Sequence, residues 1–137
     1  MSFDPYIHFQ GNARAALEAY ARIFGGTVEI MTYAEAPDAP AEMRGSDLVI
    51  HGTLRQGGCN LMASDFPPGM AGDPQQAVSI SHEAASEAKA RRVFDALTEG
   101  GAVIMPFAPT FWSDGFGMVK DRFGTHWMIS SPSRQSG

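Results

Sequence analysis

The chain of 137 residues carries a formal net charge of −5 at pH 7, and its length fits one domain or two small fused modules. The acidic balance and the lack of a basic run argue against a nucleic-acid-binding surface, and no run reaches the roughly 18 apolar residues of a membrane span. One cysteine cannot form an internal disulfide. Because the N-terminus does not resemble a leader peptide, we expect a cytoplasmic protein with no membrane contact.

Apolar spacing and turn residues predict the elements of the first half. Residues 13–24 have an apolar stripe of helical spacing, Asn12 is a suitable N-cap, and Gly25-Gly26 stops the helix. The proline-containing stretch 34–46 is predicted to be a loop. In chain order, the expected elements are a strand at 5–10, the helix at 13–24 and strands at 27–33, 48–55 and 59–64, the last two joined by a hairpin turn.

The second half repeats this order of elements. A helix over about 86–98 is stopped by Gly100-Gly101, and the turn at 121–124 contains a glycine that tolerates a positive φ. In chain order, the expected elements are a strand at 77–81, the helix at 86–98, a strand at 102–107 and a hairpin formed by 116–121 and 125–129.

The two predicted helices have matching apolar stripes. Each stripe residue of the first helix recurs 74 places later in the second (90 − 16, 94 − 20 and 97 − 23 each give 74). The matching pairs are Ala16 with Ala90, Tyr20 with Phe94 and Ile23 with Leu97. This spacing indicates an internal duplication of one supersecondary unit.

The duplication predicts an α+β fold of two tandem βαβββ modules. Their strands would form a curved mixed sheet around a cleft, with the helices on the outer face. We expect a single domain over 1–137. Within it, module one covers about 3–65, a linker 66–75, module two about 76–131 and a polar tail 132–137.

Short motifs along nearly the whole chain occur in the order and spacing of one superfamily. They are Pro5-Tyr6-Ile7 with Phe9, Gly11-Asn12, Ala16-Leu17 leading to Tyr20, Phe24-Gly25, Leu61-Met62 with Ser64-Asp65, Thr110-Phe111-Trp112, Phe116-Gly117, Asp121, Phe123-Gly124 and Trp127-Met128. With these motifs the chain resembles the vicinal oxygen chelate superfamily of glyoxalase I, extradiol dioxygenases and bleomycin-resistance proteins, and within it the PhnB-like branch. The resemblance implies paired βαβββ modules and a homodimer.

Metal enzymes of that superfamily place ligands on the first and last strand of each module. Carried over to this chain, the four positions fall on Pro5, Met62, Ala77 and Met128, with Gln76 or Ser79 as alternatives to Ala77. None of the four is a ligand that Zn²⁺, Ni²⁺, Fe²⁺ or Mn²⁺ prefers. We therefore expect no metal cofactor, and without one glyoxalase-type chemistry lacks the group that polarises oxygens. A divalent metal held by other residues is the alternative.

Histidines and one Ser-Asp pair are the other candidates for chemistry. His8 is expected on the helix side of its strand and His126 on the same face as Met128. Two histidines that converged with Asp65 would rebuild a metal or acid–base site. Ser64 and Asp65 are interpreted as turn residues or as polar ligand anchors. Cys59 has no activating neighbour, so we expect a small buried residue.

The first functional hypothesis is a protein that binds a small, partly apolar molecule in a metal-free cleft. Such pockets are mostly apolar with a few polar anchors. The candidate ligand-binding residues are the apolar Met62, Trp112 and Met128 and the polar Ser64, Ser79 and His126, whereas Trp127 is expected in the core. No catalytic residue is predicted. The alternatives are a metal-dependent lyase or dioxygenase and a structural homodimer without a ligand.

Overall fold

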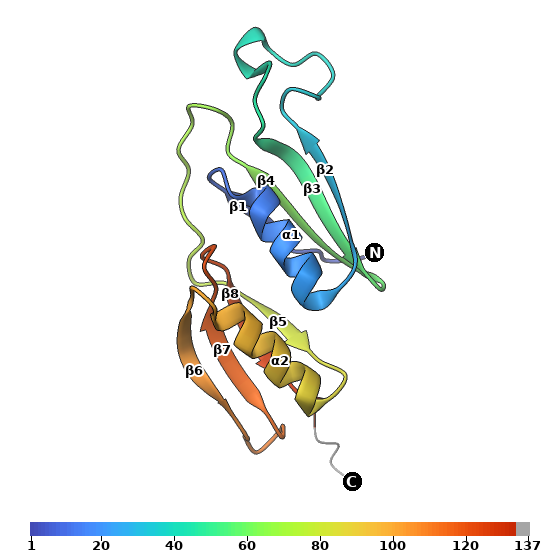
Figure 1. Cartoon of the computed structure of the whole chain (residues 1–137), viewed down its shortest axis with the longest axis vertical. Coiled ribbons are helices and arrows are strands. Elements are labelled where there is room, and N and C mark those ends of the chain that lie inside the picture. The colour runs from blue at the N-terminus through green and yellow to red at the C-terminus, as the bar shows by residue number, and fades with distance from the viewer. Residues whose placement is uncertain (134–137) are drawn as a thin grey trace. The chain divides into compact units, whose positions relative to one another are not determined.

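The computed structural model describes residues 1–133 and divides the chain into two compact units. Unit one is Met1–Gln75, and unit two begins at Gln76. Each unit is a four-stranded sheet with one helix packed on it, as Figure 1 shows. The α+β fold of two tandem modules is therefore confirmed.

Unit one has the order βαβββ. Its sheet has the spatial order β1-β4-β3-β2, in which β1 pairs parallel with β4 and the other pairs are antiparallel. The elements are β1 at Tyr6–Phe9, α1 at Ala13–Phe24, β2 at Thr27–Thr32, a short 3₁₀ helix at Ala41–Met43, β3 at Val49–Gln56 and β4 at Cys59–Asp65.

Unit two repeats this arrangement. Its sheet has the order β5-β8-β7-β6, again with one parallel pair, β5 with β8. The elements are β5 at Ser79–Glu83, α2 at Glu87–Thr98, β6 at Ala102–Ala108, β7 at Phe116–Lys120 and β8 at His126–Ser130. Each helix has 12 residues, and α2 begins 74 places after α1 (87 − 13), as the stripe repeat predicts.

A glycine on a central strand lets each helix approach its sheet closely. A Cβ added at Gly52 in β3 would lie 2.6 Å from the Leu17 side chain of α1. A Cβ added at Gly117 in β7 would lie 2.6 Å from the Phe94 ring of α2. These contacts identify the helix face of each sheet, and its residues form the core together with the buried stripe of the helix.

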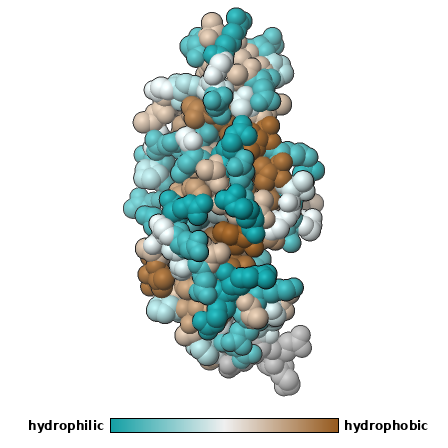
Figure 2. Space-filling model, in the orientation of Figure 1, coloured by the Kyte–Doolittle hydropathy of each residue, from teal (hydrophilic) through white to brown (hydrophobic). Residues whose placement is uncertain are grey.

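The outer surfaces of the helices are hydrophilic. In Figure 2, hydrophobic residues (brown) lie in small separate groups among hydrophilic ones (teal). Each helix is therefore amphipathic, with its apolar stripe turned to its own sheet.

One local prediction is wrong and another holds only in part. The strand expected at 77–81 begins only at Ser79, because Ala77 has a φ of 59° and interrupts the extended backbone. Asn12 occupies the N-cap position of α1, as expected, but makes no side-chain hydrogen bond to the helix. The N–H of Ala13 instead donates to Oδ1 of Asp65, at the end of β4.

Candidate functional site

The helix-free face of the first sheet carries five polar or ring-bearing side chains around the thioether of Met62. Residues alternate between the two faces of a strand, and Ile7 and Phe9 in β1 are buried on the helix side. Tyr6 pairs with Met62 and His8 pairs with Ser64, so these four side chains share the opposite face. Thr53 pairs with Met62 from the third strand, which places Thr53 and His51 on this face as well.

Hydrogen bonds connect these side chains across the sheet. Tyr6 Oη lies 3.2 Å from Nδ1 of His51, and Nε2 of His51 lies 3.2 Å from Oγ1 of Thr53. On the neighbouring row, Ser64 Oγ lies 3.4 Å from Nδ1 of His8. Of the predicted ligand residues, Met62 therefore lies between Tyr6 and Thr53, the two partners of His51, and Ser64 lies beside His8.

The prediction that His8 faces the helix is wrong. It rested on Pro5 as the ligand position of the first strand, but β1 begins at Tyr6, and Tyr6 rather than Pro5 pairs with Met62. A shift of one residue moves every side chain of a strand to the other face. His8 is therefore exposed beside Tyr6, in a place where it can contact a ligand.

Asp65 lies on the opposite, buried face and fixes the end of β4. Its Oδ1 accepts hydrogen bonds from the N–H groups of Gly11 and Ala13, and its Oδ2 accepts one from the N–H of Val49. The hydroxyl of Tyr33 donates to the Asp65 carbonyl oxygen over 2.8 Å. Burial raises the pKa of Tyr33, and the charge of Asp65 adds to this shift, so the phenol stays protonated. Asp65 is thus a structural residue and not a third site ligand.

The helix-free face of the second sheet carries three predicted ligand residues. Ser79 pairs with His126 and Ser81 with Met128, while the intervening Trp127 is buried against the helix side, as expected. Nδ1 of His126 is buried and has no hydrogen-bond partner among the described residues.

Trp112 lies in the segment between β6 and β7 and is 41 % exposed. Its ring makes edge contacts with Phe111 at 4.7 Å and with Phe116 at 5.3 Å between centroids. Phe116 pairs with Ser130, two residues beyond Met128 on the same face of β8. Trp112 is thus joined through Phe116 to the second helix-free face.

The side chains do not fit a divalent metal. Within residues 1–133, no group of three or more His, Cys, Asp or Glu side chains could hold a metal ion. On the first helix-free face the two imidazoles are accompanied by hydroxyls and a thioether, which are poor ligands for Zn²⁺ or Fe²⁺.

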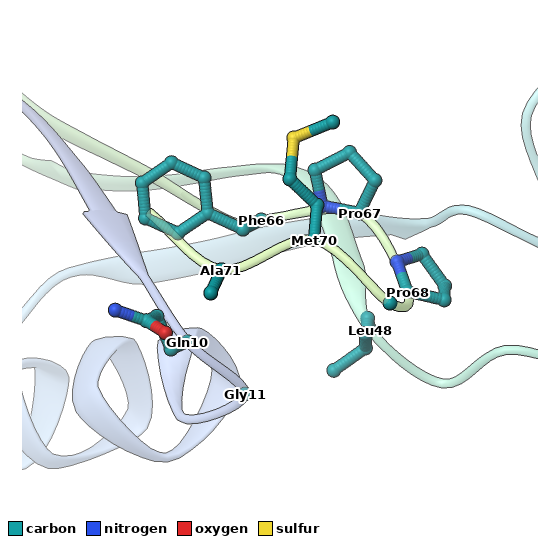
Figure 3. A pocket seen from close by; sticks show the side chains of 9 residues that line it. Gln10, Gly11, Leu48, Phe66, Pro67, Pro68, Met70 and Ala71 are labelled. Carbon is teal, nitrogen blue, oxygen red and sulfur yellow. The ribbon is translucent and has the colours of Figure 1, made fainter. Parts of the chain in front are cut away.

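An open pocket of about 310 Å³ lies beside the end of β1 (Figure 3). Its wall includes Phe66, Pro67, Pro68 and Met70, and Gln10 holds the far end of this segment through a 2.7 Å hydrogen bond from its Nε2 to the Gly72 carbonyl. The sequence did not predict this pocket. Its shape depends on the contact between Gln10 and Gly72, which are 62 positions apart, and the proline-rich composition of the segment does not reveal such a contact.

Cys59 is exposed at the start of β4, so the expected buried position is wrong. The hairpin turn before it is also exposed, which leaves no neighbouring layer to cover the thiol. It forms no disulfide within the described chain.

Comparison with known proteins gives one family. The sequence model of the family described as 3-demethylubiquinone-9 3-methyltransferase matches residues 1–130. Protein YjdN of Escherichia coli K12 is 32 % identical over 146 aligned positions, which cover 98 % of each chain.

Solved structures share the fold. Protein PA1353 from Pseudomonas aeruginosa is 39 % identical, with a TM-score of 0.87 over 96 % of this chain and 97 % of that one. A PhnB protein from Bacillus cereus is 24 % identical, with a TM-score of 0.73 over 96 % and 100 % of the two chains. A glyoxalase/bleomycin resistance protein/dioxygenase domain from Frankia is 13 % identical, with a TM-score of 0.65 over 100 % and 95 %.

Among the described residues, none of the helices has the length and apolar character needed to cross a membrane.

Proposed function

Because the chain belongs to the PhnB-like family described as 3-demethylubiquinone-9 3-methyltransferase, within the glyoxalase fold, we propose that it binds a small, partly apolar molecule without a resident metal. The observation that carries the proposal is the helix-free face of the first sheet. There Met62 offers a half-buried thioether between Tyr6 and Thr53, which both hydrogen-bond to the His51 imidazole, and Ser64 lies beside His8.

The composition of this face suits a small ligand. Ligand sites combine apolar surface with a few placed polar groups, and Tyr6, Met62, Ser64 and His8 supply both on adjacent strands. The helix-free face of unit two offers a second set of the same character, made of Ser79, His126 and Met128, with Trp112 nearby. We propose binding roles for both sets.

The methyltransferase description of the family is not part of the proposal. Methyl donors that resemble nucleotides are held by glycine-rich loops between a strand and a helix. In this chain the β1–α1 connection contains one glycine, Gly11, and the β5–α2 connection Ala84-Ala85-Ser86 contains none. The backbone of these connections therefore lacks the multiple glycines that let a pyrophosphate or similar group approach closely.

A metal-dependent lyase or dioxygenase is the competing function. It requires three or more convergent donors, which the described residues do not supply. Metal analysis of the purified protein separates the two functions, because stoichiometric Zn, Ni, Fe or Mn would overturn the metal-free proposal.

A homodimer is also proposed. β6 is an edge strand of the second sheet, and Val103, Ile104 and Met105 on it are 49 %, 54 % and 45 % exposed. Edge strands with exposed apolar side chains are open to pairing with another chain. Self-pairing of β6 in two copies would bury the same surface on both and give a closed two-fold dimer.

A thermal-shift screen of small aromatic and aliphatic compounds tests the binding role. A ligand that binds only the native state raises the melting temperature by mass action. We expect the rise caused by a hit to shrink in Met62→Ala, which removes the thioether at the site. Met43→Ala is the matched control, because Met43 is also half-buried but lies in the 3₁₀ helix at Ala41–Met43, outside the sheet. Equal shifts in both variants would place the ligand elsewhere.

A further inference from the structure

Four rings lie in a continuous row on unit one, in the order His51, Tyr6, His8 and Phe66. Their neighbouring centroids are 5.7, 5.1 and 5.7 Å apart, and the planes of neighbouring rings differ by 32°, 35° and 27°. These separations fall in the range of favourable offset contacts between rings. We call these four residues the ring row.

The ring row is accessible and is fixed in place. Tyr6 is 39 % exposed, His8 and His51 are exposed, and Phe66 is half-buried. The hydrogen bonds to Thr53 and Ser64 hold the two imidazoles, and an added Cβ at Gly72 would collide with the Phe66 ring, so the chain closes tightly over that end. A fixed stacking surface loses little conformational freedom when a guest binds.

One polar atom of the ring row is left for a guest. Both nitrogens of His51 and the hydroxyl of Tyr6 already have partners within the sheet. Nδ1 of His8 lies beside the Ser64 hydroxyl, whereas the structure shows no partner for its Nε2 within the described chain. When Ser64 donates to Nδ1, the neutral imidazole carries its proton on Nε2 and can donate it to a ligand oxygen.

The charged side chains on this face do not compete with a ligand for Nε2 of His8. Arg55 and Glu29 lie on the same face and pair with each other, with 3.6 Å between Nη2 and Oε2. Apart from this pair, the side chains named on this face are hydroxyls, imidazoles and the Met62 thioether, none of which carries a negative charge. An acidic oxygen is therefore compatible with the surroundings of His8.

We propose that the ring row binds a flat aromatic ring that carries an acidic oxygen, such as an aromatic carboxylate. The guest ring packs on the row at His8, beside Tyr6 and Phe66, and the oxygen accepts a hydrogen bond from Nε2 of His8. This inference rests on the proposed small-molecule binding function and adds the chemical class of the ligand.

Three probes separate the contributions of the ring and of the acid. Benzoate has both features, cyclohexanecarboxylate has the acid on a saturated ring, and benzyl alcohol has the aromatic ring without the acid. Titration of the full chain, followed by ¹H–¹⁵N NMR, gives the affinity and the binding face together. We expect benzoate to bind about tenfold more tightly than either other probe, with the largest shifts at the ring row.

Variants assign the contacts. His8→Phe keeps a ring and removes Nε2, so we expect benzoate affinity to fall about tenfold while benzyl alcohol is little affected. Phe66→Leu removes one ring, and we expect the preference for benzoate over cyclohexanecarboxylate to fall severalfold. Phe3→Leu is the matched control, because Phe3 is 95 % exposed in the same unit and outside the ring row.

The outcomes distinguish this inference from the function on which it rests. Equal binding of benzoate and cyclohexanecarboxylate at the ring row would overturn the aromatic class and leave small-molecule binding intact. A second result would have the same meaning. If a ligand from the thermal-shift screen depends on Met62 but none of the three probes perturbs the ring row, the aromatic class is wrong and small-molecule binding stands. If no compound in either experiment depends on this face, both the inference and the proposed function are wrong.

Discussion

Asp65 at the end of β4 accepts a hydrogen bond from the backbone N–H of Ala13, the first residue of α1, at 3.0 Å. The same carboxylate accepts bonds from Gly11 and Val49. A single buried side chain thereby joins the start of the helix, the start of β3 and the end of β4. A negative charge at a helix N-terminus also interacts favourably with the helix dipole.

Replacement of this carboxylate should destabilise unit one strongly. In Asp65→Asn the amide nitrogen takes the place of one acceptor oxygen and faces a backbone N–H, which leaves a buried donor without a partner. We expect a loss of about 3 kcal/mol in the free energy of unfolding, because bonds to charged groups contribute about 1.5–3 kcal/mol. Urea unfolding measures it. Asp73→Asn, at an exposed position in the connection between the units, is the control and should change little. Equal stability of Asp65→Asn and the wild type would contradict this role.

A methyl group on the helix face of the second sheet should separate the helix from its sheet. In Gly117→Ala the new Cβ would lie 2.6 Å from the Phe94 ring and 3.0 Å from Cα of Phe107, and the backbone atom cannot move aside alone. We expect a destabilisation of about 1–3 kcal/mol, as for other overpacked cores. Thermal unfolding gives the value.

The control for this change is Gly58→Ala in the exposed β3–β4 turn. No atom lies within 4 Å of a Cβ added at Gly58, so its melting temperature should match that of the wild type. If both alanine variants melt together with the wild type, the helix does not need the space that Gly117 provides.

Burial lowers the pKa of His82 in β5, so the stability of the fold should decrease in acid. As the pH falls below about 6.5, the unfolded chain binds a proton at this histidine before the folded chain does. The contribution is therefore complete above pH 6.5 and is lost as the pH falls toward the lower folded value. Melting temperatures of His82→Gln should fall less between pH 7.5 and 5 than those of the wild type.

Ser81→Gln serves as the control for the His82 experiment. It introduces the same side chain on an exposed position of the same strand without removing a titratable group. Its pH profile should follow that of the wild type, and a flattened profile in this variant would show that the strand rather than the imidazole is responsible.

Charge on the β6 edge should dissociate the proposed homodimer. In Ile104→Lys an ammonium group replaces an apolar side chain that is 54 % exposed on the edge strand, and charged edge residues oppose strand pairing. Light scattering after size exclusion should give twice the chain mass for the wild type and the chain mass for the variant. Val78→Lys, at a position 69 % exposed outside the strands, should remain a dimer. A monomeric wild type would end the dimer proposal.

Local patterns in the sequence predicted the elements but not the long-range contacts between them. The apolar stripes predicted both helices, because helical spacing is a local property. The first is α1 over 13–24, and the second is α2, which follows its N-cap Ser86 and ends at Thr98. The contact from Asp65 to Ala13 was missed because it crosses 52 positions of sequence.

The faces on which the candidate residues lie were predicted in part for the same reason. Alternation along β4 and β8 placed Met62, Ser64, His126 and Met128 on the helix-free faces of their own sheets. The start of β1 was predicted one residue too early. Because successive side chains of a strand point to opposite faces, this error placed His8 on the wrong face. Phe66 was read as part of a loop, and its contact with His8 depends on the path of the chain after β4.

The carboxylates of the two units differ in how far along the chain they reach. Asp121 accepts bonds from Phe123, Thr125 and Trp127, all within six positions, whereas Asp65 reaches partners 16 to 54 positions away. Short loops close at a smaller entropic cost than long ones. During refolding, the amides of 123 and 125 should therefore gain protection from hydrogen exchange before those of 11 and 13. The second half of this duplicated chain should thus fold before the first, in the reverse of their order in the sequence.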